Sequence, residues 1–299
     1  MKIIIPIIII IILVSLIEIY SYIFRRRQPK YLLKILDKKQ HADDYYTRRA
    51  DNAEAIRRCK KERFEMKSDR GETLCGYYYP CGEGHSKKMV LFFHGYHNFG
   101  AADAGMFREY YHSRGFDIFA VDTTACGESG GRVIGFDVLE SADGLKWIDF
   151  LREHFGADIK LVLHGISLGA ATVLKMSDRV PENVKFIVED SGFTDARDIL
   201  RKKSGALFPL MAWMQKVFGH CDVAESCVLD NVRNAKAPIL VVHGMGDDFV
   251  PFEMAPKIFE LCPEGSDKLF TPKLKHTETS HYNRAGYEAK LDEFIEKYI

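Results

Sequence analysis

Five short, continuous apolar runs constrain the fold of this 299-residue chain more than any other feature of its sequence. The runs are rich in Val, Ile, Leu and Phe and lack the alternation of a strand with one solvated face. Strands buried on both faces have this composition, and such strands form parallel sheets covered by helices on both sides. The runs are 89–93, 116–121, 160–163, 184–188 and 239–242.

Stretches with helical spacing of apolar residues follow several of these runs. Two earlier strands, 63–68 and 72–79, are predicted to form a hairpin through the turn Asp69-Arg70-Gly71. Because strands and helices alternate along the chain, we expect an α/β fold over residues 62–299, with a mostly parallel sheet flanked by helices. The predicted helices are 102–113, 138–155, 168–178 and 283–298.

One connection, residues 192–235, is far longer than a minimal crossover between parallel strands. It combines a cluster of apolar residues with several basic ones. We expect a small helical cap over the carboxyl edge of the sheet, where open α/β sheets bind their ligands. Phe208, Met211 and Trp213 are therefore candidates for lining a substrate pocket, although the same cluster also suits packing within the cap.

The first residues of the chain are strongly apolar. As a helix, residues 3–24 span about 33 Å, against about 30 Å for the hydrocarbon core of a bilayer. A cleaved signal peptide is the alternative, but its apolar region is shorter and small residues mark its cleavage site, where this chain has bulky ones. We therefore predict a transmembrane anchor at residues 1–24, in contact with membrane lipid.

The net charge of zero hides an asymmetry. Residues 25–70 hold 16 Lys and Arg against 8 Asp and Glu, whereas residues 71–299 hold 25 against 33. Residues 25–61 are predicted to be a basic, helical juxtamembrane neck that faces anionic headgroups. The positive-inside rule places the body of the protein in the cytoplasm. A neutral chain without a dedicated basic surface is not expected to bind nucleic acid.

Seven scattered cysteines show neither C-x-x-C pairs nor the Cys/His spacing of a zinc site. Free thiols are typical of a reducing compartment, which agrees with the cytoplasmic assignment. The sequence also lacks a phosphate-binding loop and a dinucleotide fingerprint. We expect no metal and no cofactor.

Two segments match the pattern G-x-S-x-G, and they differ in their surroundings. Ser167 lies in 165–169, between the apolar run 160–163 and a predicted helix. A nucleophilic serine needs this strand, sharp turn and helix, because the turn projects its oxygen. Ser129 lies in 127–131, where further glycines make an immediate helix unfavourable. Ser167 is therefore the candidate nucleophile.

A nucleophilic serine needs a base, and the base needs an orienting acid. Asp247 follows the run 239–242, at the same edge of the sheet as Ser167. Two histidines lie downstream, and we predict that His281, just before the final helix, is the base. Asp248 and His276 are interpreted as surface residues.

An oxyanion that forms on the substrate needs backbone N–H donors. We expect one from Leu168, which follows the nucleophile, and one from Tyr96, in the loop after the run 89–93. His94 is interpreted as a structural residue that braces this loop.

These segments resemble the α/β-hydrolase superfamily over residues 62–299, and most of all its serine aminopeptidase/lipase-like branch of bacterial hydrolases with an N-terminal membrane anchor. Segment 134–147, with Glu140, Asp143 and Trp147, resembles a part of the membrane-anchored members. Where the family has D-x-R-x-H-G-x-S, this chain has Thr124 and Cys126 in place of Arg and His. The resemblance rests on His94-Gly95, 122–129, 164–171, 243–251 and His281.

The resemblance implies a catalytic Ser167, Asp247 and His281, and oxyanion donors at Tyr96 and Leu168. We expect a serine hydrolase that cleaves an acyl bond of a small-molecule substrate, with a carboxylic ester as the favoured class. The alternatives are an aminopeptidase or amidase, for which Glu189 and Asp190 are candidate recognition residues, and a non-catalytic membrane-tethered binding module.

Overall fold

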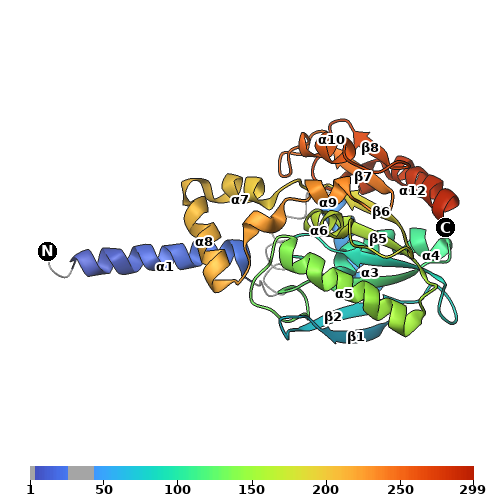
Figure 1. Cartoon of the computed structure of the whole chain (residues 1–299), viewed down its shortest axis with the longest axis horizontal. Coiled ribbons are helices and arrows are strands. Elements are labelled where there is room, and N and C mark those ends of the chain that lie inside the picture. Colours follow the sequence, from blue (N-terminus) through green and yellow to red (C-terminus); the bar gives the residue numbers. More distant parts are fainter. Residues whose placement is uncertain (1–3, 26–43) are drawn as a thin grey trace.

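The computed structural model describes residues 4–25 and 44–299 (Figure 1). Within these residues, eight strands form one sheet in the order β1-β2-β4-β3-β5-β6-β7-β8. The pairs β1–β2 and β2–β4 are antiparallel and all other pairs are parallel. The strands are β1 Glu62–Lys67, β2 Thr73–Tyr79, β3 Lys88–Phe93, β4 Asp117–Asp122, β5 Lys160–Ile166, β6 Val184–Asp190, β7 Ile239–Gly244 and β8 Asp267–Thr271. The predicted α/β fold with a mostly parallel sheet is confirmed.

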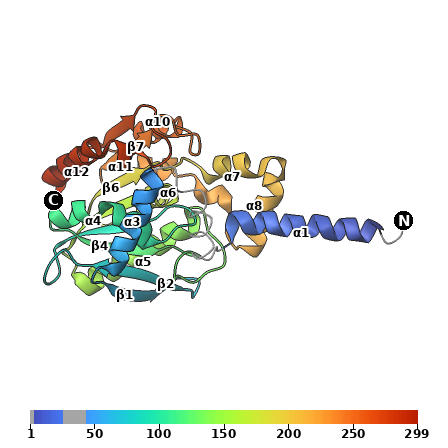
Figure 2. The same ribbon diagram turned by 180° about the vertical axis from the view of Figure 1, so that it is seen from behind.

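Helices cover both faces of the sheet (Figures 1 and 2). Along β3, Leu91 and Phe93 pack into one core cluster and Val90 and Phe92 into the other. Burial on both faces is why the strands read as continuous apolar runs. The first cluster includes residues of α5 Val138–Phe155, α6 Leu168–Met176, α9 Leu229–Arg233 and α10 Met254–Phe259, and the second includes residues of α3 Asp44–Arg58, α4 Gly100–Ser113 and α12 Arg284–Tyr298.

β8 has no counterpart among the predicted strands. It is the last strand of the sheet, and its residues are partly exposed. A strand at the edge need not be apolar on both faces, so Asp267 and Lys268 leave no continuous apolar run. This omission matters for the site, because the loop after β8 carries His276, which contacts Ser167.

Helix α3 is the described part of the predicted neck; residues 26–43 of that neck lie outside the described residues. The helix lies along α4, and Figure 2 shows it crossing that face of the body. Gly105 makes the close approach possible, since a Cβ there would lie 2.6 Å from the carbonyl oxygen of Asn52. The neck helix is therefore packed onto the body.

The connection 192–235 forms the helical cap, as expected. It contains α7 Ala196–Ser204, the 3-10 turn η1 Gly205–Leu207, α8 Phe208–Phe218, the turn η2 Val223–Ser226 and α9. A third core cluster joins Met211 and Met214 of α8 to Tyr20, Ile23 and Phe24. The last three belong to α1, Ile4–Phe24, so the end of the N-terminal helix is packed against the cap.

Candidate active site

Ser167 lies on a strained turn between β5 and α6. Its φ of 55° and ψ of −113° are unusual for a residue with a side chain. Neighbouring glycines make the turn possible: a Cβ at Gly165 would lie 2.2 Å from the carbonyl oxygen of Gly169, and one at Gly169 would lie 2.1 Å from that of Phe93. The strand, turn and helix predicted from the sequence are present.

A continuous hydrogen-bonded chain joins Ser167, His276 and Asp247. The Nε2 atom of His276 lies 2.8 Å from the Oγ of Ser167, and its Nδ1 lies 2.7 Å from the Oδ2 of Asp247. An ionised carboxylate only accepts hydrogen bonds, so we assign the proton to Nδ1. Nε2 is then free to accept the proton of the serine hydroxyl.

His281 does not take part in this chain, so the prediction that it acts as the base is wrong. Its Nε2 lies 3.1 Å from the Oδ2 of Asp44, and its ring packs edge-on against the ring of Tyr45. The physical reason is its position in a short helix, α11 Thr279–Tyr282, which turns the side chain toward α3.

His276, interpreted from the sequence as a surface residue, takes the place of His281. It lies in the loop after β8, and the carboxyl ends of parallel strands meet at one edge of the sheet. The backbone N–H of Thr277 donates to the Oγ of Ser191 at 3.2 Å, which ties this loop to the end of β6. Recognition of the weak strand β8 was the signal that would have separated the two histidines.

Asp247 is held in its ionised form. Its side chain is fully buried, and its Oδ1 accepts the N–H groups of Phe249 and Val250, both at 2.9 Å. Burial opposes ionisation, but hydrogen bonds from His243 and His276 outweigh it and hold the pKa of Asp247 well below its usual range. A fixed negative charge therefore faces the Nδ1 of His276.

The loop predicted to supply an oxyanion donor lies directly against Ser167. A Cβ built on Gly95 would lie 3.5 Å from the Cβ of Ser167. The N–H of Gly95 donates to the Oδ2 of Asp103 at 2.8 Å, and Tyr96 lines the same cavity as Ser167. Leu168 is the first residue of α6, and the first N–H groups of a helix have no partner within the helix.

His94 braces this loop, as interpreted from the sequence. Its Nδ1 lies 2.7 Å from the carbonyl oxygen of Gly95, and its Nε2 accepts the N–H of Thr123 at 3.1 Å. The histidine therefore connects the oxyanion loop to the end of β4.

Helix α3 contributes two residues to the surroundings of the site that the sequence did not mark. Arg49 forms an ion pair with the buried Asp103, the same carboxylate that accepts from the oxyanion loop. The hydroxyl of Tyr45 lies 2.7 Å from that of Thr277, beside His276. One helix thus supports both the oxyanion loop and the histidine loop. No local motif marks these residues, since their partners are distant in the sequence.

A cavity of about 490 Å³ opens beside Ser167. Phe208, Met211 and Trp213, the predicted pocket residues, are not among those that line it. α8 turns Met211 inward toward α1 and Trp213 outward, while the guanidinium of Arg201 covers the ring of Phe208. The lining consists of Tyr45, Arg49, Gly95, Tyr96, Ile166, Ser167, Asp248, Phe249, Lys275, His276, Thr277 and Glu278.

Glu189 and Asp190, the candidate residues for binding a substrate amine, are fully buried at the end of β6. Burial raises the pKa of Glu189 to about 7 and that of Asp190 to about 6. Glu189 accepts the N–H of Gly192 at 2.8 Å, and neither carboxylate lines the cavity. The structure gives them a role in the scaffold.

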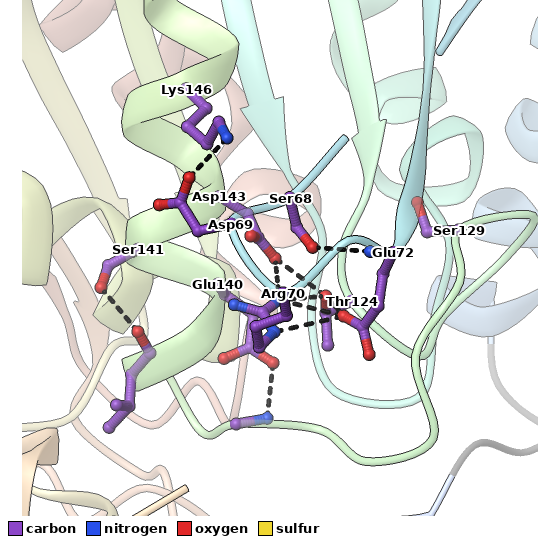
Figure 3. A network of polar contacts seen from close by, with 12 residues as sticks. Ser68, Asp69, Arg70, Glu72, Thr124, Ser129, Glu140, Ser141, Asp143 and Lys146 are labelled. Atoms are coloured by element: carbon purple, nitrogen blue, oxygen red, sulfur yellow. Dashed lines mark hydrogen bonds and ion pairs between the residues drawn. The ribbon is translucent and has the colours of Figure 1, made fainter. Parts of the chain in front are cut away.

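An arginine from elsewhere in the chain braces the turn where the family motif is altered. Arg70, in the β1–β2 turn, donates to the Oγ1 of Thr124 at 2.9 Å and to the Oδ2 of Asp143 at 2.7 Å (Figure 3). Thr124 also donates to Asp143, at 2.8 Å. Ser129, the second G-x-S-x-G serine, is fully buried, donates to the carbonyl of Asp122 and accepts the N–H of Cys75. Its role is structural.

No group of three or more His, Cys, Asp or Glu side chains is arranged to hold a metal ion within residues 4–25 and 44–299.

The sheet order, the serine turn and the similarity to known proteins define an α/β-hydrolase. Residues 138–299 match the prolyl oligopeptidase family, and because this match covers more than half of the chain, the protein belongs to that family. The predicted membership of the α/β-hydrolase superfamily is thereby confirmed.

Individual proteins that are similar to this chain share only a low sequence identity with it. The α/β-hydrolase domain-containing protein aho-3 of Caenorhabditis elegans is 25% identical over 249 residues, which cover 80% of this chain and 66% of the relative. An esterase from Pyrococcus furiosus superposes with a TM-score of 0.67 at 19% identity, covering 82% of this chain and 93% of the esterase. A puromycin-hydrolysing peptidase from Mycobacterium tuberculosis gives a TM-score of 0.60 at 17% identity, covering 78% and 38%. These structural likenesses concern the fold.

Proposed function

We propose that the protein is a membrane-anchored serine hydrolase that cleaves carboxylic esters through an acyl-enzyme. The observation that carries the proposal is the chain from Ser167 through His276 to the buried Asp247, at a strained turn beside an open cavity. A serine in an ordinary βα turn has no need of a base at hydrogen-bond distance, nor of a carboxylate behind that base.

In the first half of the reaction, the Oγ of Ser167 attacks the substrate's carbonyl carbon while its proton passes to the Nε2 of His276. The carbonyl oxygen becomes an oxyanion, and the backbone N–H groups of Leu168 and Tyr96 are the proposed donors to it. Removal of one such donor costs about 3–4 kcal/mol of transition-state stabilisation. His276 then gives the proton to the departing alcohol, which leaves an acyl group on Ser167.

In the second half, water takes the place of the alcohol. His276 accepts a proton from the water as it attacks the acyl-enzyme, and then returns the proton to Ser167 as the acid product leaves. Asp247 stays ionised throughout. It fixes the ring orientation through Nδ1 and stabilises the positive charge that the imidazole acquires.

Esters are favoured over amides because an alcohol leaves more easily than an amine. A peptidase or amidase is the second candidate, and the match to the prolyl oligopeptidase family favours it. The residues that line the cavity carry both signs of charge, so the cavity lacks the acidic excess that a free N-terminus requires; they include Arg49, Lys275, Asp248 and Glu278. A non-catalytic binding module is the third candidate.

A substrate panel separates these candidates. The full-length protein in detergent is assayed against nitrophenyl esters of increasing chain length and against prolyl and other aminoacyl nitroanilides. We expect ester hydrolysis that is lost in Ser167→Ala. Hydrolysis of the nitroanilides alone favours the peptidase, and no Ser167-dependent turnover of either class contradicts the proposal.

The N-terminal helix is the proposed anchor. Among the described residues, α1 alone is long and apolar enough to cross a membrane, with a mean hydropathy of 2.7. We propose that the body lies in the cytoplasm, on the basis of the basic residues that follow the helix. Protection of the body from protease in intact cells supports this orientation, and its digestion reverses it.

A further inference from the structure

Five large apolar side chains of the cap are exposed. Leu207, Leu210, Trp213 and Val217 recur at helical spacing along η1 and α8, and their exposed fractions lie between 37% and 54%. Phe218, at the end of α8, is 61% exposed and packs edge-on against Trp213. Soluble surfaces rarely gather so many large apolar groups on one helix, so this face is expected to have a partner.

This face of the cap adjoins the proposed anchor. The hydroxyl of Tyr20 in α1 donates to the Oε1 of Gln215 in α8 at 3.0 Å, and the two helices share the third core cluster. Figures 1 and 2 both show α8 beside the C-terminal end of α1, with the cap extending from the body in the direction of that helix. Apolar surface therefore continues from α1 onto α8.

The position of the cap along α1 shows where the cap lies relative to a membrane. The 21 residues of α1 give about 32 Å of helix, which only just exceeds the hydrocarbon thickness of about 30 Å. Near its C-terminal end, Tyr20, Ile23 and Phe24 are buried against the cap and the body. The cap thus lies at the end of an otherwise exposed apolar helix, so insertion of that helix into a bilayer brings the cap to the membrane surface. The exposed Glu18 then lies at the depth of the interface.

The charges of the cap fit the same location. Residues 196–218 contain five Lys and Arg and one Asp, in a chain whose net charge is zero. Lys202 and Lys203 lie at the end of α7, next to the apolar turn η1. A helix with an apolar face and basic flanks is the kind that lies in the interface of an anionic bilayer.

We propose that the cap is a second membrane contact, in which η1 and α8 rest in the interface of an anionic phospholipid bilayer beside α1. Tyr96 links this membrane contact to the active site. It lines the cavity at Ser167, and its hydroxyl donates to the carbonyl oxygen of Ile23 at 2.5 Å. The cavity thus opens next to the C-terminal end of α1, where the helix leaves the membrane, and this places bilayer-resident acyl esters within reach. This consequence rests on the proposed function, whereas the membrane contact does not.

Trp213 provides a direct test, because the chain has two tryptophans and the other, Trp147, is buried in the core. The full-length protein is reconstituted into phosphatidylcholine–phosphatidylglycerol vesicles, some with bromine atoms near the top of the acyl chains. The signal of Trp213 is obtained as the difference between wild type and Trp213→Phe. We expect blue-shifted emission, quenching by the brominated lipid of roughly half or more, and weak quenching by aqueous acrylamide.

Emission from Trp213 that brominated lipid leaves unquenched overturns the proposal. The result of acrylamide quenching then tells what surrounds the side chain. Quenching by acrylamide indicates exposure to water, and no quenching indicates that a second copy of the chain or another protein covers Trp213; both outcomes contradict the membrane contact. Flotation of the vesicles reports the anchor separately. Loss of flotation shows that α1 does not hold the protein in the bilayer, which removes the basis of the membrane contact and also contradicts the proposal.

Activity gives a second readout. Leu210→Glu puts a charge on the proposed lipid face. Ala289→Glu is the control, because it puts the same charge at an exposed position of α12, on the body. We expect Leu210→Glu to slow hydrolysis of a vesicle-embedded ester by about tenfold, with a water-soluble ester and Ala289→Glu little affected. Equal rates for both variants on the embedded ester contradict the contact. If the wild-type protein is inactive, only the proposed function is contradicted, because the Trp213 signal does not depend on catalysis.

Discussion

The same substitution, histidine to asparagine, is expected to have very different effects on activity at the two histidines that follow β8. In His276→Asn, Ser167 loses the group at 2.8 Å that accepts its proton, and Asp247 loses the Nδ1–H at 2.7 Å. Removal of a catalytic base of this kind lowers kcat by about 10³–10⁶, or about 4–8 kcal/mol in activation free energy. We expect a loss in this range for the full-length protein with a nitrophenyl ester, with KM changed little.

His281→Asn is the matched control. It removes a hydrogen bond to Asp44, whose side chain is 60% exposed, and an edge contact with Tyr45. Exposed pairs contribute about 0–1 kcal/mol, so we expect a small loss of stability and a kcat/KM within about threefold of wild type. Circular dichroism checks that both variants fold. A folded His276→Asn that keeps its activity while His281→Asn loses it refutes the assignment of the base.

Three further predictions follow from the surroundings of the site. Asp103→Asn weakens the bond that holds the N–H of Gly95, so kcat is expected to fall about 10–100-fold with KM within about twofold; an unchanged kcat would show that the loop holds itself. Ser129→Ala removes a fully buried hydroxyl with two hydrogen bonds, so urea unfolding should show a loss of about 1–3 kcal/mol while kcat stays near wild type. Burial raises the pKa of Glu140 from 4.5 to about 7, so its proton stabilises the folded state fully below about pH 4.5, and this stabilisation of about 3 kcal/mol is lost as the pH rises through 7. Glu140→Gln should remove that share of the pH dependence in urea unfolding at about pH 5 and about pH 8, and an unaltered dependence would assign it to other groups.

The parts of the fold that burial dictates were predictable from the sequence. Strands such as β3 and β5 are apolar on both faces because helices cover both faces, and the run of residues records this directly. The turn at Ser167 was predictable because its glycine pattern is local in the sequence. Gly165 lies against backbone atoms of the same turn, and Gly169 lies against the end of β3, the neighbouring strand in the sheet. β8 was missed because an edge strand carries a weaker demand for apolar residues.

The parts of the site that depend on distant contacts were not predictable in this way. His276 and His281 both lie in the stretch between β8 and α12, and what separates them is the end of a strand that composition does not reveal. Tyr45 and Arg49 belong to a segment whose charge suggested only a membrane neck. Their partners, Thr277 and Asp103, are brought to them by the packing of α3 on the body.

The central claim is that the hydroxyl of Ser167 is an activated nucleophile. Its most direct test is the reaction of the full-length protein with a fluorophosphonate probe, followed by mass spectrometry to locate the label. We predict stoichiometric labelling on Ser167 in wild type, abolished in Ser167→Ala and strongly slowed in His276→Asn. Folded wild-type protein that stays unlabelled, or that carries the label on a different residue, would contradict the account.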